Sequence, residues 1–431
     1  MALGGGTFVS FNKVLPGTYA NFRSKVEEEK INFLGYVGLA QEFYGASGMK
    51  CINASDIRSD DNYCLREFGF SLESTQMTWL RELLKGGAQT IYVYNTLTGG
   101  TQAKNTYATA KYAGTRGNDI KITIETQLDS TFDVVTYLDN KVVDTQNVTK
   151  ATELISNDYV TFSDTALTDT SNAALTGGTD GTVNNVAHEN FLNEIETIYT
   201  NVVICTAVDD TTKALYVQAA CDFIENTGNK TLFVLHKAIA DYPSIYNVDT
   251  CVTANGTGAN GIIYWFGGKL ANADYNTSLT NKIYDGELEI ADTYTQTELI
   301  AAIKNGKIVL HKVGEKYNIL KEVTAHQTVT KDLNKDFKIG QHVRIVFGVL
   351  IQQATVFNEL HLGITQGNPS GEAKVYTAMT AVLDDFAKNG CLEYVSDDIS
   401  VEKVDKESVR VLEAFTTAVA IDKLYLDATV D

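Results

Sequence analysis

The sequence has few prolines and no long apolar run. Its three prolines (Pro16, Pro243 and Pro369) provide no proline-rich linker, so we expect domains that are inserted into and packed on one another. No run of apolar residues approaches the roughly 18 residues that span a bilayer, which excludes a predicted membrane anchor. The segment from Met1 to Gly6 has neither a basic nor an apolar part, so we expect no signal peptide and a protein that stays in the cytoplasm where it is made.

Basic residues and paired cysteines are also scarce. The 35 Lys and Arg residues are outnumbered by 54 Asp and Glu residues, which gives a formal net charge of -19. This charge excludes nucleic acid and anionic membranes as expected partners, because both repel an acidic surface. The six cysteines have no C-x-x-C spacing and are predicted to be reduced, mostly structural thiols.

Catalytic, nucleotide-binding and metal-binding motifs are absent from the sequence or stand outside their usual structural context. The loop Gly256-Thr257-Gly258-Ala259-Asn260-Gly261 satisfies G-x-G-x-x-G, yet no clear strand leads into it, so a packed loop is the preferred interpretation. The nearest approach to G-x-S-x-G, at residues 45–49, lacks the last glycine, and the six histidines have no metal-binding spacing. We therefore predict no catalytic, cofactor-binding or metal-binding residues. A subtilisin-like or nucleotide-binding enzyme is kept as the alternative, and an exported cell-surface lattice protein as a third class.

What the sequence does contain is an α/β pattern between residues 175 and 323. A helix over 186–200 leads into the apolar run 202–205, and a helix over 211–226 leads into 232–235, which predicts a parallel sheet with covering helices. A capping box, Thr295 to Glu298, opens a helix over 299–304, and a hairpin over 308–311 and 317–323 follows. Residues 31–39, 76–84 and 90–94 read as a strand, a helix and a strand of the same body.

Two further regions differ from this body. Short β runs at 108–111, 119–127, 131–138, 141–148 and 159–162 predict a β-sandwich or barrel that interrupts the α/β body. After residue 324, an apolar stripe predicts a helix over 337–360 that is buried on most sides, and a second helix starts near Pro369 and ends at Asn389-Gly390. Strands at 396–403 and 408–412 follow.

Both ends of the chain alternate like isolated strands. Such a strand needs a neighbour for its hydrogen bonds, so each end pairs either with its own body or with another copy. Two such ends on an acidic body without catalytic motifs indicate a subunit that polymerises by donating strands. The predicted inter-subunit residues are Thr7, Val9, Phe11, Val14, Tyr19 and Phe22 at the start, and Leu424, Tyr425, Leu426, Ala428 and Val430 at the end.

Several motifs, in order along the chain, resemble the contractile tail sheath proteins of phages of Gram-positive bacteria and of related phage-tail-like particles. They are Gly5-Gly6-Thr7-Phe8, Asn12 to Tyr19, Lys111 to Ile120, Leu175 to Gly181, Asn276 to Thr280, and Lys335-Asp336-Phe337. Each motif is weak alone, and the ordered set is specific. One departure is the segment Ala420 to Lys423, where relatives tend to have a proline.

The resemblance implies a fold of mixed class: a subtilisin-like α/β sheath domain, an inserted β-sandwich, an α+β C-terminal domain and two extended arms. The implied boundaries are 1–23 for the N-terminal arm, 24–98 and 177–325 for the two parts of the sheath domain, 99–176 for the sandwich, 326–412 for the tube-facing domain and 413–431 for the C-terminal arm. The name subtilisin-like carries no activity here, because no Ser/His/Asp motif can be transferred.

The resemblance also implies the partners. We expect hexameric rings of this chain, stacked into a helical sheath around a tail tube protein, with baseplate and tail terminator proteins at the ends and the virion tail as the location. Contraction from a long, metastable lattice to a short one would drive the tube through a cell envelope. On the second C-terminal helix, Lys374, Lys388 and Glu372 are predicted to face the tube.

Overall fold

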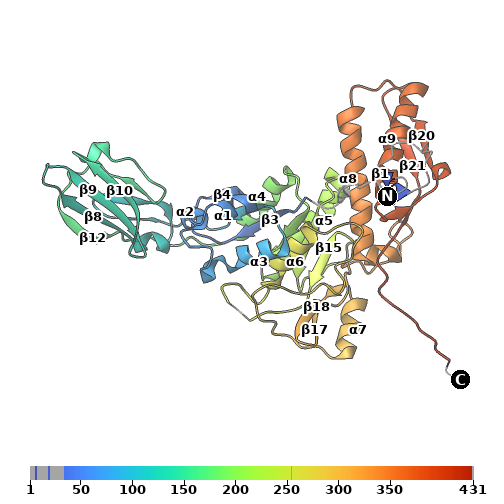
Figure 1. Cartoon of the computed structure of the whole chain (residues 1–431), viewed down its shortest axis with the longest axis horizontal. Coiled ribbons are helices and arrows are strands. Elements are labelled where there is room, and N and C mark those ends of the chain that lie inside the picture. Colours follow the sequence, from blue (N-terminus) through green and yellow to red (C-terminus); the bar gives the residue numbers. More distant parts are fainter. Residues whose placement is uncertain (1–4, 7–17, 20–33, 254, 430–431) are drawn as a thin grey trace. The chain divides into compact units, whose positions relative to one another are not determined.

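The computed structural model describes residues 5–6, 18–19, 34–253 and 255–429 (Figure 1). The chain forms two compact units, Met1–Ile31 and Asn32–Asp431. The described residues of the first unit are two short strands, β1 (Gly5–Gly6) and β2 (Thr18–Tyr19), which pair in parallel. All further elements belong to the second unit.

The second unit is built on a central sheet with the strand order β16-β15-β14-β13-β3-β5-β4. Each neighbouring pair is parallel except β4 and β5, which run antiparallel at one edge. The predicted parallel sheet is therefore confirmed, and the antiparallel edge strand β4 was not predicted. The strands are β3 (Tyr36–Gln41), β4 (Gly48–Asn53), β5 (Thr90–Asn95), β13 (Val202–Ile204), β14 (Leu232–His236), β15 (Ile245–Val248) and β16 (Lys307–Ile308).

Helices cover the sheet because its strands are apolar on both faces. On one face, Phe191 of α4 and Tyr216 of α5 pack with Phe233 of β14 in a buried cluster. On the other face, α6 packs on β13 and β14, and α3 packs closely on α6. The helices are α1 (Ala54–Ser59), α2 (Tyr63–Phe68), α3 (Thr78–Gly86), α4 (Asn185–Glu196), α5 (Asp210–Asp222), α6 (Ile262–Ala271) and α7 (Gln296–Lys304).

Glycines set the spacing between α3 and α6. A Cβ atom on Gly268 would lie 2.5 Å from the carbonyl oxygen of Leu83, and one on Gly86 would lie 2.5 Å from that of Trp265. The two helix backbones could not approach this closely with any larger residue. The glycines after the predicted helix over 76–84 thus serve as packing residues as well as helix terminators.

Three local predictions can be compared directly with the structure. The capping box is confirmed: the Thr295 hydroxyl accepts a hydrogen bond from the Glu298 amide, and the Glu298 carboxylate accepts one from the Thr295 amide. The hairpin is confirmed as β17 (Leu310–Val313) and β18 (Lys316–Ile319), although Ile308 belongs to the central sheet instead. The helix predicted over 186–200 ends at Glu196, so its prediction was too long.

Residues 102–174 form two antiparallel sheets around a second core. One sheet has the order β10-β9-β8-β12 and the other β11-β7-β6. Buried side chains from both sheets, such as Ile122, Val134 and Val160, share one apolar cluster, which confirms the predicted β-sandwich. Its strands are β6 (Gln102–Lys104), β7 (Ala108–Ala113), β8 (Ile120–Thr126), β9 (Phe132–Leu138), β10 (Lys141–Val148), β11 (Val160–Phe162) and β12 (Thr170–Ala174).

The two segments that connect the sandwich to the α/β body run side by side. Isolated bridges pair Thr98 with Thr182 and Thr101 with Thr179. Two of the motifs that carry the family resemblance meet here, because Asn118 exchanges hydrogen bonds with the backbone of Gly178 at 2.9 and 3.0 Å. These two motifs therefore form the junction between the sandwich and the body.

A buried arginine fastens the sandwich to the body at this junction. The Nε atom of Arg116 donates to the carbonyl of Gly69, just after α2, at 2.8 Å. Its two terminal nitrogens bind Asp119 and Asp139 within the sandwich, at distances of 2.5 to 2.8 Å. The guanidinium lies over the ring of Phe70, 4.5 Å from its centroid. A single side chain thus holds both parts, using the planar, five-donor geometry that lysine lacks.

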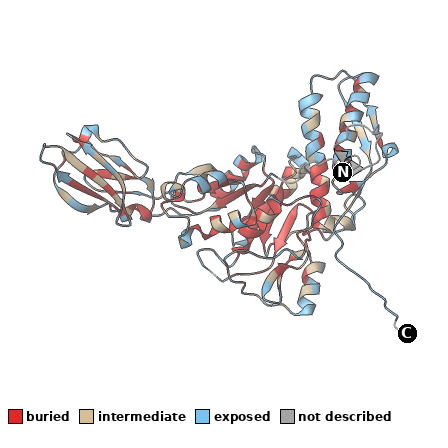
Figure 2. Ribbon diagram, viewed as in Figure 1, coloured by how far each residue is buried: buried red, intermediate tan, exposed pale blue. Residues whose placement is uncertain are grey.

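The last region combines two long helices with short strands. They are α8 (Gly340–Leu360), α9 (Pro369–Lys388), β19 (Leu392–Glu393), β20 (Ile399–Lys403), β21 (Val409–Glu413) and β22 (Thr416–Thr417). The prediction that the first helix is buried on most sides is correct only up to Val349. Beyond it only Gln353 is buried, since this half of α8 has α9 as its main neighbour (Figure 2). Of the described helices, none is long and apolar enough to cross a membrane.

A buried ion pair joins α8 to the body. The side chains of Arg344 and Glu322 have no exposed surface, and Nε of Arg344 lies 2.8 Å from Oε1 of Glu322. Its terminal nitrogens donate to the carbonyls of Asp274 and Thr277, both at 2.7 Å, and one of them also donates to the second oxygen of Glu322 at 3.1 Å. The second carboxylate oxygen accepts the amide of Leu279 at 2.7 Å. Every charge in this group is paired and hydrogen-bonded, which a buried ion pair requires to be tolerated.

Candidate functional site

The loop with G-x-G-x-x-G spacing is packed against the protein itself. A Cβ atom on Gly256 would lie 1.9 Å from the carbonyl oxygen of Thr75, and one on Gly261 would lie 2.2 Å from the Thr257 hydroxyl. The Asn260 side chain donates to the carbonyl of Thr206 at 3.0 Å. The glycines are therefore explained by close packing within the chain, as the preferred interpretation of the sequence had it.

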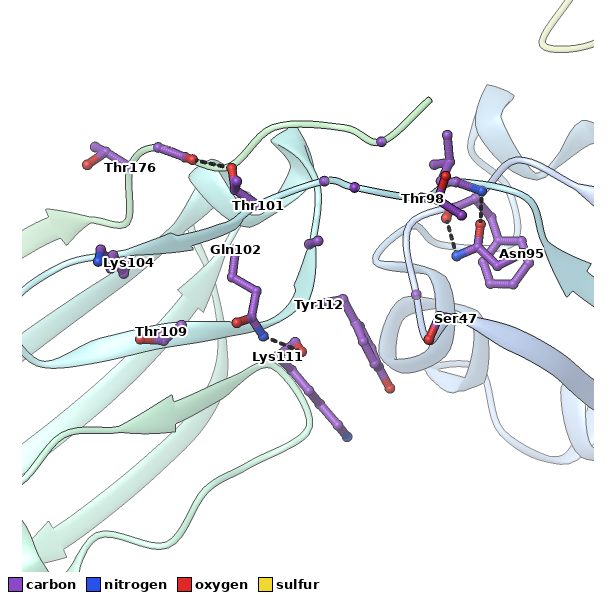
Figure 3. A pocket seen from close by; sticks show the side chains of 18 residues that line it. Ser47, Asn95, Thr98, Thr101, Gln102, Lys104, Thr109, Lys111, Tyr112 and Thr176 are labelled. Atoms are coloured by element: carbon purple, nitrogen blue, oxygen red, sulfur yellow. Dashed lines mark hydrogen bonds between the residues drawn. The ribbon is translucent and has the colours of Figure 1, made fainter. Parts of the chain in front are cut away.

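A cavity of about 1060 Å³ lies along the junction between β6, β7 and the body (Figure 3). Its polar groups are already used to hold the backbone. Asn95 donates to the carbonyls of Phe43 and Ala46, and Gln102 donates to that of Lys111. In the described part of the chain, no group of three His, Cys, Asp or Glu residues is placed to hold a metal ion. Asn95 and Gln102 thus have a structural role in this groove.

The predicted residues of the N-terminal arm fall almost entirely outside the described residues. Thr7, Val9, Phe11, Val14 and Phe22 are in this group. Tyr19 is the exception, because its backbone forms part of β2 and pairs with Gly6 of β1. The predicted role of this arm stays a prediction.

The first residues of the C-terminal segment, up to Asp422, are bonded to other parts of the chain, and the residues after Asp422 are exposed. The amide of Ala418 donates to the carbonyl of Cys391, and the amide of Ala420 donates to the side chain of Gln341, both at 2.8 Å. Asp422 forms an ion pair with Lys321 at 2.5 Å. The paired strands extend to Thr417, so the free part of the chain starts later than residue 413.

After Asp422 the chain is exposed and makes no hydrogen bond with any described residue (Figure 1). The side chains of Leu424, Tyr425 and Leu426 are 85%, 87% and 79% exposed, and Ala428 is exposed as well. The strand predicted here is absent up to Thr429, and Val430 lies outside the described residues. The physical reason is that a strand needs a partner for its backbone groups, and no described residue pairs with this segment.

Two small sheets in the same region have unoccupied edges. β20 and β21 pair only with each other, and so do β19 and β22, among the residues that the structure describes. Ile399 of β20 is buried against α9, while Val404 and Leu412 of the hairpin are 63% and 36% exposed. The free backbone groups of β20 and β21 are a template for a further strand.

The predicted tube-facing residues lie on α9 but not on one face. Lys374 and Lys388 are both exposed, and their 14-residue separation places them within about 40° of each other around the helix. Glu372 is only two residues from Lys374, which puts it on the far side, next to the buried face of Val375, Met379 and Phe386. The two lysines thus lie on the same side of α9, about 21 Å apart along its axis, and the glutamate lies on another side.

Comparisons with known proteins agree with this architecture. Residues 98–180 match the phage tail sheath protein beta-sandwich domain, and residues 181–325 match the phage tail sheath protein central domain. Two Bacillus subtilis (strain 168) proteins are similar over 80% of this chain and 80% of their own length: the uncharacterized protein YqbK, 31% identical, and the phage-like element PBSX protein XkdK, 29% identical. The crystal structure of the sheath tail protein DSY3957 from Desulfitobacterium hafniense is 27% identical, with a TM-score of 0.79 over 93% of this chain and 100% of that one.

Proposed function

Because this chain belongs to the phage tail sheath protein family, we propose that it is the structural subunit of a contractile sheath and polymerises around a tail tube through its terminal arms. The observation that carries the proposal is the exposed apolar segment after Asp422, which has no partner among the described residues. Isolated apolar side chains are common on surfaces, but a run of three at a chain end that lacks backbone partners favours docking on another molecule.

The hairpin of β20 and β21 is the proposed receiver of this segment on a neighbouring copy. β21 has five residues, and the exposed segment from Leu424 to Thr429 has six, so the lengths match. Addition of a strand would satisfy the free backbone groups of both partners and cover Leu412. Because the donor and receiver surfaces are different, the contact is head-to-tail and can propagate into rings or an open helix.

This receiver can be tested by a disulfide between copies. Leu412→Cys combined with Leu426→Cys should yield covalent multimers after mild oxidation of the assembled protein, because added strands place opposed side chains about 5 Å apart. Peptide mass spectrometry would identify the cross-link. The matched control pairs Leu426→Cys with Val142→Cys, an exposed site on the sandwich, and should give none. Equal cross-linking in both pairs would contradict this receiver.

We also propose that the exposed lysines of α9 contact the tube. Lys374→Glu with Lys388→Glu should weaken assembly on the tube on the order of tenfold at low salt, through the loss of charge complementarity, and should spare polymerisation without a tube. Sedimentation of sheath with purified tubes would measure this. Lys150→Glu, an exposed site on the sandwich, is the control. An unchanged tube affinity of the double variant would refute the assignment.

The proposed mechanism is mechanical. Subunits assemble as hexameric rings stacked on the tube, between baseplate and terminator proteins, in a long lattice that is kinetically trapped. Release at the baseplate lets the bodies rotate as rigid units into a shorter lattice with more buried contact, while the arms keep neighbours joined. The location that follows is the tail of a phage or of a phage-like particle, and no enzymatic step is required.

Electron microscopy of the purified protein tests the function directly. We expect tubes or stacked rings with a six-fold end view, formed by the protein alone or on added tail tubes. A protein that remains a monomer at high concentration, with and without tubes, would contradict the proposal. A fluorophosphonate probe and a nucleotide-binding assay test the enzyme alternative, and both should be negative.

A further inference from the structure

A cluster of titratable side chains lies where two parallel strands of the central sheet end. His236 is the last residue of β14, Lys237 follows it, and Cys251 comes three residues after the end of β15. The Nζ atom of Lys237 donates to the sulfur of Cys251 at 3.0 Å. The Nε2 atom of His236 lies 3.8 Å from the same sulfur. The carboxyl ends of adjacent parallel strands thus bring three reactive groups together.

Of the two nitrogens, that of Lys237 is the donor to the sulfur. A lysine ammonium has only hydrogens to offer, and Nε2 of His236 also lies 3.2 Å from the carbonyl oxygen of Thr250, which can only accept. The hydrogen on Nε2 is therefore directed at the carbonyl of Thr250, and the imidazole lies beside the sulfur without donating to it. The positive charge of the ammonium, 3.0 Å from the sulfur, favours negative charge that develops on the sulfur during a reaction.

The backbone keeps Lys237 in this position. Lys237 has a φ of 48°, in the left-handed region that residues other than glycine rarely adopt. Its amide donates to the carbonyl of Val248 at 2.9 Å, which fixes the turn after β14 against the end of β15. The lysine side chain remains 43% exposed and Cys251 is partly exposed, so solvent reaches both residues.

The carboxylate of Asp292 has two opposite effects on the pair of Cys251 and Lys237. One oxygen of its carboxylate accepts the Cys251 amide at 2.7 Å and the Tyr294 hydroxyl at 3.1 Å, and it lies 4.0 Å from the Lys237 ammonium. The negative charge disfavours a second anion nearby, yet it also holds Lys237 in its charged form. The hydrogen bond to Cys251 raises the pKa of Lys237 above its ordinary value, although burial acts against this.

The other cysteines are in contrasting surroundings. Burial raises the pKa of Cys64 and Cys205 to about 12 and that of Cys391 to about 11. Burial also raises the pKa of Cys221 and of Cys51, the most exposed of the six. These five are thiols at neutral pH, which react slowly.

We propose that Cys251 is an oxidative modification site, with its sulfur beside the Lys237 ammonium and reactive toward hydrogen peroxide and organic hydroperoxides. The thiol proton passes to solvent as the sulfur reacts. The sulfur attacks one peroxide oxygen, so that an S–O bond forms while the O–O bond breaks. The sulfur is oxidised by two electrons to a sulfenic acid and the peroxide is reduced. The departing hydroxide, or alkoxide, takes a proton from Lys237, which regains one from solvent. Thiols can reverse the product.

The test ranks the six cysteines of the purified full-length chain. With limiting iodoacetamide at neutral pH and peptide mass spectrometry, Cys251 should react at least about tenfold faster than the more exposed Cys51. With one equivalent of hydrogen peroxide and dimedone as the trap, the sulfenic acid should form at Cys251. A faster reaction at Cys51, or no dimedone adduct at Cys251, would overturn the proposal.

Variants of the residues next to Cys251 test whether its reaction rate depends on these residues or only on its exposure to solvent. Lys237→Met should slow Cys251 about tenfold and leave Cys51 unchanged, whereas Lys237→Arg should retain most of the rate. An unchanged Cys251 rate in Lys237→Met would overturn the role of the lysine. Should that variant not fold, Asp292→Asn decides instead: it removes the opposing charge and should speed the reaction. An equal or slower rate would refute the proposal.

Discussion

Replacing Arg344 with methionine should lower the free energy of unfolding by about 3–5 kcal/mol, because Glu322 would be left as an unpaired buried carboxylate. The side chain also supplies hydrogen bonds to the carbonyls of Asp274 and Thr277, which would lose their donor. Urea denaturation followed by circular dichroism would measure the change. α8 should be the first element to loosen, since the pair joins it to the body.

Controls distinguish the buried pair from ordinary surface charges. Lys321→Met removes the ion pair with Asp422, which is partly exposed, and should cost no more than about 1 kcal/mol. The double variant Arg344→Met with Glu322→Leu should recover part of the loss, because it leaves no uncompensated charge. A loss in Arg344→Met that is no larger than that in Lys321→Met would show that the pair contributes little.

Removing Leu424 to Asp431 should abolish polymerisation while leaving the subunit folded. The removed segment makes no hydrogen bond with any described residue, so its loss should change the melting temperature by less than about 1 °C. Assembly should fall to background, because the neighbour's β20–β21 sheet loses its added strand. Electron microscopy and analytical ultracentrifugation would compare the truncated and full-length chains.

A full-length variant serves as the control. It tests whether assembly depends on the apolar side chains of the C-terminal segment or only on the presence of the segment. Leu424→Ser with Leu426→Ser keeps the backbone donors and acceptors but removes two apolar side chains, and should weaken assembly less than the truncation does. Long, regular sheaths from the truncated protein would contradict strand donation by this end. They would leave the family membership intact, since that depends on other parts of the chain.

The sequence predicted local features well where the signal lies within a few residues. The capping box at Thr295 depends on a three-residue spacing, and the alternating runs of the sandwich depend on a two-residue period. Both signals are local, so the structure reproduces them. The buried face of α9, with Val375, Met379 and Phe386, is a third example.

Features that depend on distant partners could not be predicted. Arg344 lies in the apolar segment of α8, and nothing in the spacing selects Glu322, 22 residues earlier, as its partner. The predicted buried stripe of α8 was too long, because the apolar pattern does not reveal where the helix leaves the α/β body. The strand predicted at the C-terminal end is not formed within the described chain, because alternation reports which side chains suit a sheet, not whether a sheet is present.

The paired connections of the β-sandwich have a practical consequence. Because Thr98 lies beside Thr182 and Thr101 beside Thr179, the chain leaves the α/β body and returns to it at neighbouring points. Whatever replaces the intervening residues needs only two ends that lie close together, as most folded domains have. This position is therefore the natural place to graft a fluorescent or affinity module into the particle without disturbing the remaining architecture.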